Sequence, residues 1–347
     1  MRLFSRHLPH LRDLGVLAVG FAAAALSACS GPSTPPPVAT GAEPGTNPIF
    51  RDVFTADPAP LVVGDRLYVY VGRDQATGDQ MFNLQEWLAY STTDMRTWEA
   101  HGPIMRATDF AWARGDAWAS QVVERDGRFY FYTTVTHDST SPGRAVGVAV
   151  SDSPTGPFVD ARGSALVTDD STPSDNPWDD IDPTVFIDDD GTAWLAWGNP
   201  NLYFARLKPN MTEIDGEITR VEVPNYTEGP WLHKRDDTYY LTYACYAHQG
   251  MWEKICSATA PAITGPWTPR GTLMDQTEKS YTIHPGIVEF RDQWYLFYHT
   301  AQLTLDGEEG GLGRRSVAVE YLTYRPDGTM RPVEKTVAGV TVPPPTP

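Results

Sequence analysis

Three acidic residues occupy similar places in separate parts of the sequence. They are Asp57 in ADPAP, Asp182 in DDIDPTVFIDDDG and Glu228 in TEGPWLHKRDDTYYLTYA. Three carboxyl groups brought together on one surface cannot all ionise freely, so their pKa values must separate, which provides an acid and a base at one pH. Hydrolysis of a glycosidic bond needs such a pair, one group to protonate the leaving oxygen and another to activate water or attack. A lone Asp-Pro is usually only a turn, so the interpretation depends on the elements around these residues.

These acids belong to a sequence pattern that occurs five times. The other two copies are centred on Ser120 and His284, and the steps between the five positions are 63, 62, 46 and 56 residues. Each copy has an apolar run, a Gly/Asp turn and a run of alternating aromatic residues, which is typical of a β-hairpin. Repeats of this length predict propeller blades. We therefore expect an all-β, five-bladed β-propeller over residues 48–340, whose innermost strands bring the acids to one face.

The N-terminus has the features of an export signal. An apolar run over residues 14–26 follows several arginines, and Leu26-Ser27-Ala28-Cys29 resembles a bacterial lipobox. We expect residues 1–28 to be a lipoprotein signal peptide and Cys29 to carry the lipid; cleavage after Ala28 without lipidation is the alternative. Residues 29–47, rich in Pro, Gly, Ser and Thr, predict a linker. The protein would then be exported and held at a bacterial membrane only through its lipid, in the periplasm or at the cell surface.

The composition restricts the class of protein. Hydrophobic residues make up 41% of the chain and charged residues 20%, which predicts a globular domain. The net charge of −17 would repel phosphate groups, so we expect no nucleic-acid partner. Aromatic residues, 12% of the chain, suit both sheet packing and stacking on sugars. Cys245 and Cys256 could bridge across a hairpin outside the cytoplasm or stay two buried thiols, and both outcomes remain open here.

Five motifs, taken in order, resemble glycoside hydrolase family 43, and most of all its arabinoxylan arabinofuranohydrolases. The matching stretches are ADPAP, DDIDPTVFIDDDG, TEGPWLHKRDDTYYLTYA, HPGIVEFRDQWYLFYH and GRRSVAVEYL, within residues 48 to about 335. The resemblance implies a five-bladed propeller that hydrolyses with inversion. It implies Asp57 as the general base, Glu228 as the general acid, and Asp182 as the group that raises the pKa of the acid and orients it. Inversion would place the base and acid carboxyl groups about 6.5–9.5 Å apart.

Three further residues are candidates for the site. The resemblance implies that His284 lies near the propeller axis, where it would help to hold a hydrated structural calcium or a water, and that Arg315 points into the sugar site. Trp118, beside the inner position of the second blade, could stack on the sugar. Each has a structural alternative: a core histidine, a surface cation and a packed core tryptophan. Imidazole is a poor calcium ligand, so any calcium would be held mainly through waters, and catalysis would require no cofactor.

These observations predict a glycosidase that hydrolyses O-glycosyl bonds and releases pentoses. The expected substrate is a plant cell-wall polysaccharide or oligosaccharide, most of all the α-L-arabinofuranosyl side groups of arabinoxylan. A β-xylosidase or an arabinanase would use the same site. A non-catalytic carbohydrate-binding propeller would share the fold, but it would have no reason to bury three acids. A sialidase would repeat the Asp-box turn, which residues 190–194 match faintly and only once. We also expect a monomer.

Overall fold

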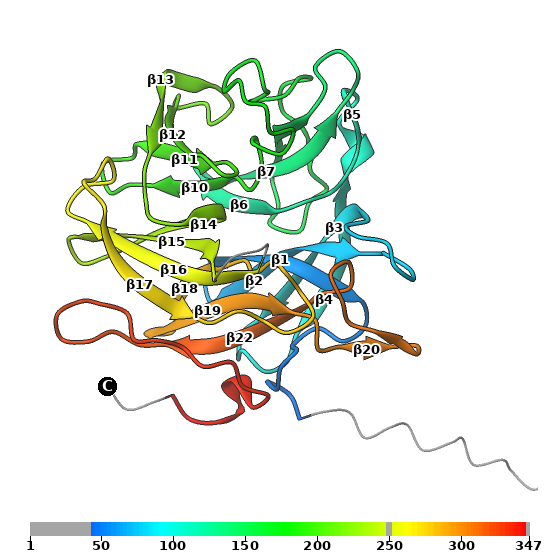
Figure 1. Ribbon diagram of the computed structural model, residues 1–347, viewed down its shortest axis with the longest axis vertical. Helices are drawn as coiled ribbons and strands as arrows, with labels where there is room; N and C mark the ends of the chain where they lie inside the picture. Colours follow the sequence, from blue (N-terminus) through cyan, green and yellow to red (C-terminus); the bar gives the residue numbers. More distant parts are fainter. Residues whose placement is uncertain (1–42, 248–251, 345–347) are drawn as a thin grey trace, which may run out of the picture. The chain divides into compact units, whose positions relative to one another are not determined.

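The computed structural model describes residues 43–247 and 252–344 (Figure 1). The predicted signal peptide, Cys29 and the linker up to residue 42 lie outside these ranges and stay predictions. Within the described ranges the helices are two 3₁₀ turns, η1 (Ala107–Asp109) and η2 (Gly339–Thr341). No helix in this part of the chain is long and apolar enough to cross a membrane.

The strands build five main sheets that follow one another round a ring in chain order (Figure 1). The first blade contains β1 (Phe54–Val63), β2 (Arg66–Asp74), β3 (Leu84–Thr92) and β4 (Glu99–Arg106). The second contains β5 (Ala113–Gly115), β6 (Ser120–Arg125), β7 (Arg128–His137), β8 (Arg144–Ser151) and β9 (Val159–Asp160). The third contains β10 (Thr184–Ile187), β11 (Ala193–Trp197), β12 (Leu202–Leu207) and β13 (Ile214–Val221).

The remaining two blades complete the ring. The fourth contains β14 (Tyr226–Arg235), β15 (Thr238–Tyr246), β16 (Glu253–Ala260) and β17 (Thr268–Met274). The fifth contains β18 (Gly286–Phe290), β19 (Gln293–Thr300) and β22 (Ser316–Leu322). A separate hairpin, β20 (Thr304–Leu305) and β21 (Glu308–Glu309), lies between β19 and β22 in the sequence. The predicted fold class, an all-β five-bladed propeller, is confirmed.

The inner strands β1, β6, β10, β14 and β18 each contact the next one round the axis, and β18 contacts β1. The five repeat positions lie within these strands or up to two residues before them, so the repeat locates the inner end of every blade. Because neighbouring inner strands touch, side chains at these positions converge although dozens of residues separate them in the chain.

Aromatic alternation in the second strand of each blade reflects burial on both faces of the sheet. In β19, Tyr295 and Phe297 pack into the core between the fifth and first blades, whereas Leu296 and Tyr298 pack into a different hydrophobic cluster. A blade is covered by a neighbour on each side, so both faces of a middle strand must be apolar. The alternating aromatic residues in the sequence therefore mark a strand whose two faces pack into two different hydrophobic cores.

Residues before β1 help to close the ring. The backbone N–H of Ile49 donates to the carbonyl oxygen of Val317 at 2.9 Å, so this segment lies along the outer edge of β22. The side chain of Asn47 accepts from the N–H of Val319 at 2.9 Å and donates to its carbonyl oxygen at 3.1 Å. Asn47, which we predicted to be the last residue of the linker, is buried in this arrangement. The N-terminal segment thus ties the first blade to the last.

Cys245 and Cys256 form a disulfide, with their Cα atoms 5.9 Å apart. They lie on adjacent strands, where Cys245 pairs with Lys254 and Cys256 pairs with Tyr243. The bridge therefore links β15 to β16 within the fourth blade, across the segment that joins these two strands. The sequence alone did not decide between a disulfide and two buried thiols, and the structure contains the disulfide.

Candidate active site

The backbone turns sharply at two of the acidic positions. Asp57 has φ of 54° and Asp182 has φ of 61°, a left-handed conformation that non-glycine residues rarely adopt. Each is followed by proline, and at Asp57 the register of β1 against β2 shifts between Ala56 and Ala59. Bulges of this kind re-aim side chains and accommodate proline within a strand.

Each of these turned residues is held by the preceding blade in the ring. The N–H of Asp57 donates to Nδ1 of His299 in the fifth blade at 3.3 Å. The N–H of Asp182 donates to Oγ1 of Thr134 in the second blade at 2.8 Å. Both backbone donors, which the kink removes from the sheet ladder, are therefore satisfied by a neighbouring sheet.

In the fourth blade the left-handed conformation falls on Gly229, one residue after Glu228. Its φ is 58°, and its N–H donates to Oδ2 of Asp182 at 3.1 Å. A Cβ atom at this glycine would overlap the His284 ring. Glycine is needed here for two separate reasons, the positive φ and the close approach of the imidazole.

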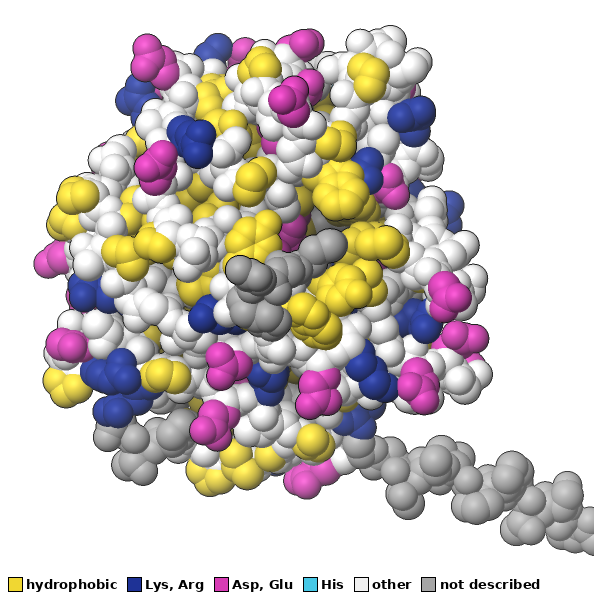
Figure 2. Space-filling model, in the orientation of Figure 1, with side chains coloured by type: hydrophobic (Ala, Val, Ile, Leu, Met, Phe, Trp, Pro, Cys, Tyr) yellow, Lys and Arg dark blue, Asp and Glu magenta, His cyan; other side chains and the backbone are white. Residues whose placement is uncertain are grey.

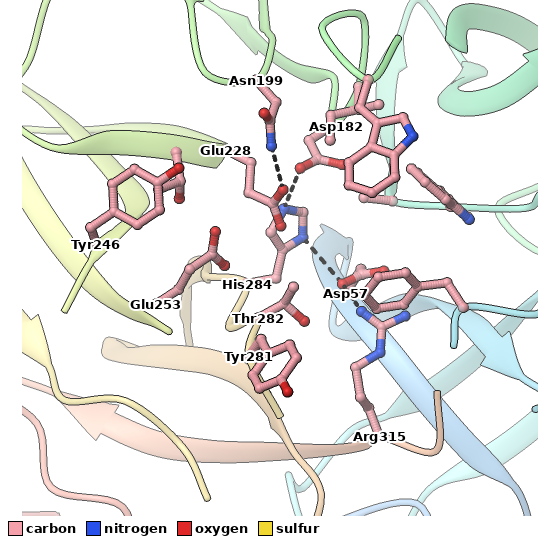
Figure 3. Close-up of a pocket in the computed structure, with 16 residues that line it drawn as sticks. Asp57, Asp182, Asn199, Glu228, Tyr246, Glu253, Tyr281, Thr282, His284 and Arg315 are labelled. Atoms are coloured by element: carbon pink, nitrogen blue, oxygen red, sulfur yellow. Dashed lines mark hydrogen bonds and ion pairs between the residues drawn. The ribbon is translucent and has the colours of Figure 1, made fainter. Parts of the chain in front are cut away.

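All six predicted site residues other than Cys29 line one pocket of about 290 Å³ (Figure 3). They are Asp57, Trp118, Asp182, Glu228, His284 and Arg315. All five blades supply them, from their inner strands or from the residues directly before a strand. The structure thus brings four of the five distant repeat positions to one pocket, all except Ser120.

A guanidinium and an imidazole lie close to the carboxylate of Asp57. Nη1 of Arg315 lies 3.1 Å from its Oδ1, and Nδ1 of His299 lies 3.2 Å from the same oxygen. Burial by itself would raise the pKa of Asp57, but the positive charge of Arg315, supported by that of His284, outweighs burial and holds the pKa well below its ordinary value. Asp57 is therefore a carboxylate over the whole range in which the protein would work.

Arg315 is fixed by a second carboxylate. Its Nε and Nη2 donate to Oδ2 and Oδ1 of Asp74, both at 2.9 Å, in a two-point contact. Its side chain is 4% exposed, so the alternative of a surface cation is wrong. Burial would lower the pKa of Arg315, but Asp57 and Asp74 raise it instead. A permanent positive charge thus stands beside Asp57.

Glu228 has the opposite electrostatic environment. Asn199 donates from Nδ2 to its Oε2 at 2.8 Å (Figure 3). Desolvation, followed by the negative charge of Asp182, raises the pKa of Glu228 to about 8. Near neutral pH, Glu228 is therefore mostly protonated and Asp57 ionised, in one pocket.

His284 lies between two carboxylates near the axis (Figure 3). Its Nε2 is 3.3 Å from Oδ2 of Asp182, and its Nδ1 is 3.7 Å from Oδ1 of Asp57. Burial lowers the pKa of His284, but the charges of Asp182 and Asp57 outweigh burial and raise it to about 9.

The predicted hydrated calcium stays a prediction, since it would be held mainly through waters and not by these side chains directly. A protonated imidazole has no lone pair for a metal, and here both ring nitrogens face carboxylates. Among residues 43–247 and 252–344, no group of three or more His, Cys, Asp or Glu side chains is arranged to hold a metal ion. His284 itself supplies the positive charge at this point of the axis.

Aromatic side chains form the walls and rim of the pocket. Trp118 lines it, with the Arg144 guanidinium 3.9 Å from the ring centroid and Phe82 in an edge contact at 5.9 Å. Trp178, Tyr246 and Tyr281 stand at the rim and are 41%, 46% and 37% exposed. Figure 2 shows hydrophobic side chains gathered around the middle of this face. Exposed aromatic faces around a polar centre suit the binding of sugar rings.

The profile of glycosyl hydrolases family 43 matches residues 45–330, most of the described chain. The chain belongs to this family. The predicted family is therefore confirmed, and its members in solved structures share the propeller found here.

The chain is similar in sequence to several family 43 enzymes. It is 29% identical over 344 residues to an arabinoxylan arabinofuranohydrolase of Bacillus subtilis, covering 85% of this chain but 65% of that protein. It is 28% identical over 333 residues to a xylosidase/arabinosidase of Bacteroides ovatus, covering 81% and 95%. An α-L-arabinofuranosidase of known structure from Clostridium thermocellum is 32% identical, with a TM-score of 0.69 and 84% and 97% of the two chains covered. The chain thus spans less than two thirds of the first of these relatives.

The family 43 site contains residues that the repeat did not predict. Asp74, Asn199 and His299 stand at the ends of second strands or just after them. In an antiparallel hairpin the second strand returns to the end at which the first began, so these residues arrive beside the inner positions. The end of each aromatic run was therefore a usable signal for Asp74 and His299. Glu253, the first residue of the third strand in its blade, had no such signal.

We expect Gly229→Ala to lower both stability and activity, because the new methyl group must displace His284. Gly64, in the turn between β1 and β2, is the matched control, since its φ is 62° and no atom lies within 4 Å of an added Cβ. Gly64→Ala should destabilise by about 1–2 kcal/mol through backbone strain alone. Gly229→Ala should destabilise by about 1–3 kcal/mol more, measured by urea unfolding. Equal destabilisation by the two substitutions would contradict the packing of Gly229 against His284.

Proposed function

We propose that this family 43 chain is an inverting glycoside hydrolase that releases pentose residues, most of all α-L-arabinofuranosyl side groups from arabinoxylan or its oligosaccharides. One observation supports the chemistry above all: a carboxyl group with a raised pKa, Glu228, and a carboxylate with a lowered pKa, Asp57, line the same small pocket. Opposed pKa shifts of this kind assign the acid and base roles.

In the proposed mechanism, Asp57 removes a proton from a water that attacks the anomeric carbon. Glu228 donates its proton to the glycosidic oxygen as the bond between that oxygen and the anomeric carbon breaks. The sugar leaves with inverted configuration, and the proton passes back from Asp57 to Glu228 through solvent. The protons move only between carboxyl groups, water and sugar, so the reaction as proposed needs no cofactor.

Asp182 acts through Glu228 in this proposal. Its negative charge keeps Glu228 protonated, and its Oδ2 accepts from the N–H of Gly229, which orients the adjoining Glu228. Arg315 keeps Asp57 ionised, and His284 balances the charges of Asp57 and Asp182. Burying these carboxylates without a chemical purpose would lower stability, which argues against a binding-only propeller.

The relatives support a pentose substrate and leave a second candidate. Two relatives act, by name, on arabinofuranosyl groups, which supports release of arabinofuranose here. The relative from Bacteroides ovatus is named a xylosidase/arabinosidase, which supports β-xylosidase activity as the alternative for the same site. A pocket of about 290 Å³ is near the lower end of the usual range for ligand sites, which suits removal of one sugar at a time.

We also propose that the enzyme works outside the cytoplasm, anchored through a lipid on Cys29. The support is the lipobox-like Leu26-Ser27-Ala28-Cys29, and the Cys245–Cys256 disulfide suits an oxidising compartment. Labelling with a fatty-acid probe in cells would test this, since Cys29→Ala should lose the label.

The decisive experiment follows the first sugar released from arabinoxylan, linear arabinan and xylo-oligosaccharides by NMR. We expect arabinose from arabinoxylan, appearing first as the anomer opposite to that of the substrate. Initial release of the same anomer would contradict inversion. Release of xylose alone would establish the alternative substrate, and no product from any of the three would support a binding function.

Glu228→Ala and Asp57→Ala should each lower kcat by a factor on the order of 10² or more while the protein remains folded. Glu228→Ala removes the proton donor, and Asp57→Ala removes the base. Circular dichroism melting curves serve as the folding control. Turnover within a few-fold of the wild type in either folded variant would refute that assignment.

The pH profile tests the role of Asp182. The acid works only while protonated, so kcat/KM should fall as pH rises through the pKa of Glu228, about 8. Removing the neighbouring negative charge in Asp182→Asn lowers that pKa, so the alkaline limb should move to lower pH. Asp190→Asn, the same change at the far, exposed end of the hairpin, is the control and should leave the limb in place. An unshifted limb in Asp182→Asn would contradict the coupling.

A further inference from the structure

A fourth carboxyl group lines the pocket, and hydrolysis as proposed does not use it. Glu253, the first residue of β16, is 6% exposed, and its Oε2 is fully buried. Within the described residues this oxygen has no hydrogen-bond partner. A buried polar atom without a partner is costly to a folded protein. Such an atom in a pocket wall points to a ligand that completes its hydrogen bonding.

The backbone of Glu253 is fixed against a neighbouring loop. Its N–H donates to the carbonyl oxygen of Tyr281 at 2.9 Å, which ties β16 to the loop before β18. Oγ1 of Thr227, the residue before Glu228, also lines this wall and is likewise buried and unpaired in the described part of the chain. In Figure 3 the Glu253 carboxyl group points into the pocket beside Glu228. Thr227 is close enough to influence the pKa of Glu253, yet neither its Oγ1 nor Oε2 of Glu253 has a partner at hydrogen-bond distance within the described residues.

This wall lies on the acid side of the pocket. Glu253, Thr227 and Tyr246 all come from the fourth blade, which also carries Glu228, whereas Asp57 comes from the first. In an inverting reaction the water attacks from the side of the base, and the leaving group departs past the acid. A group bound by the fourth-blade wall is therefore part of the leaving sugar.

We propose that Glu253 hydrogen-bonds a hydroxyl group of the leaving sugar and so makes the enzyme favour a sugar over other leaving groups. This inference rests on the proposed hydrolytic function. Burial raises the pKa of Glu253, which favours a neutral carboxyl group that can both donate and accept. A sugar hydroxyl group also donates and accepts, so the two are complementary. Binding such a hydroxyl group satisfies an atom that is otherwise buried and unpaired.

The test compares two leaving groups on the same pentose. One substrate is the 4-nitrophenyl glycoside, whose leaving group has no sugar hydroxyl groups; the other is the matching oligosaccharide, either arabinofuranosyl-xylotriose or xylobiose. The readout is the ratio of kcat/KM for the oligosaccharide to kcat/KM for the nitrophenyl glycoside. In Glu253→Ala this ratio should fall on the order of 10- to 100-fold, the effect of losing a buried hydrogen bond. In Glu253→Gln it should stay within about threefold of the wild type, because an amide also donates and accepts.

Glu86 provides the matched control. It is also 6% exposed, but it pairs with Arg73 and does not line the pocket. Glu86→Ala should leave the ratio unchanged even if it lowers the melting temperature. An unchanged ratio in Glu253→Ala, with equal losses on both substrates or with none, would overturn the proposal, as would a loss in Glu253→Gln as large as in Glu253→Ala. A wild type inactive on every substrate would instead refute the proposed function.

Discussion

The ion pair between Arg315 and Asp57 is the interaction on which the rest of the site depends. Arg315 holds Asp57 ionised, and Asp74 in turn fixes the guanidinium through two hydrogen bonds. These residues lie where the last blade meets the first. Thr55 donates its N–H to the carbonyl oxygen of Arg315 at 3.0 Å, and Asn47 binds β22 at the outer edge of the same junction. Arg315 therefore takes part both in closing the ring and in keeping the proposed base ionised. A change that separated the first and last blades would also raise the pKa of Asp57.

On the opposite side of the pocket, no arginine or lysine among the described residues pairs with Glu228. Glu228 has the amide of Asn199 and the carboxylate of Asp182 as neighbours, and its pKa rises as a result. Asp57 and Glu228 are chemically similar residues. Their pKa values differ because each carboxyl group lies at a different junction between blades, with different charges around it. His284 stands between the two sides and contacts a carboxylate on each. Its positive charge also contributes to the lowered pKa of Asp57.

The spacing of the repeats predicted the fold and most of the site, because in a propeller equivalent positions of successive repeats lie next to each other round the axis. Asp57, Asp182, Glu228 and His284 occupy equivalent inner positions, and the family motif added Arg315. Asp74 and His299 were within reach of the same reasoning, since a hairpin returns its second strand to the end where it began. Glu253 and Asn47 were not, because their partners belong to loops and edges whose paths depend on how blades pack. The hydrated calcium predicted near His284 stays a prediction, because its ligands would be mainly waters.

The left-handed backbone at Asp57 and Asp182 shows how the blades depend on one another. Such a conformation costs about 1–2 kcal/mol at a non-glycine residue, and it persists only where the surroundings enforce it. Here the enforcing groups, His299 and Thr134, both come from the preceding blade. In the fourth blade, Asp182 has the same role: it comes from the preceding blade, and its carboxylate accepts a hydrogen bond from the N–H of Gly229. Each acidic position is thus held by its neighbour in the ring, so the geometry of the site belongs to the closed propeller and to no single blade.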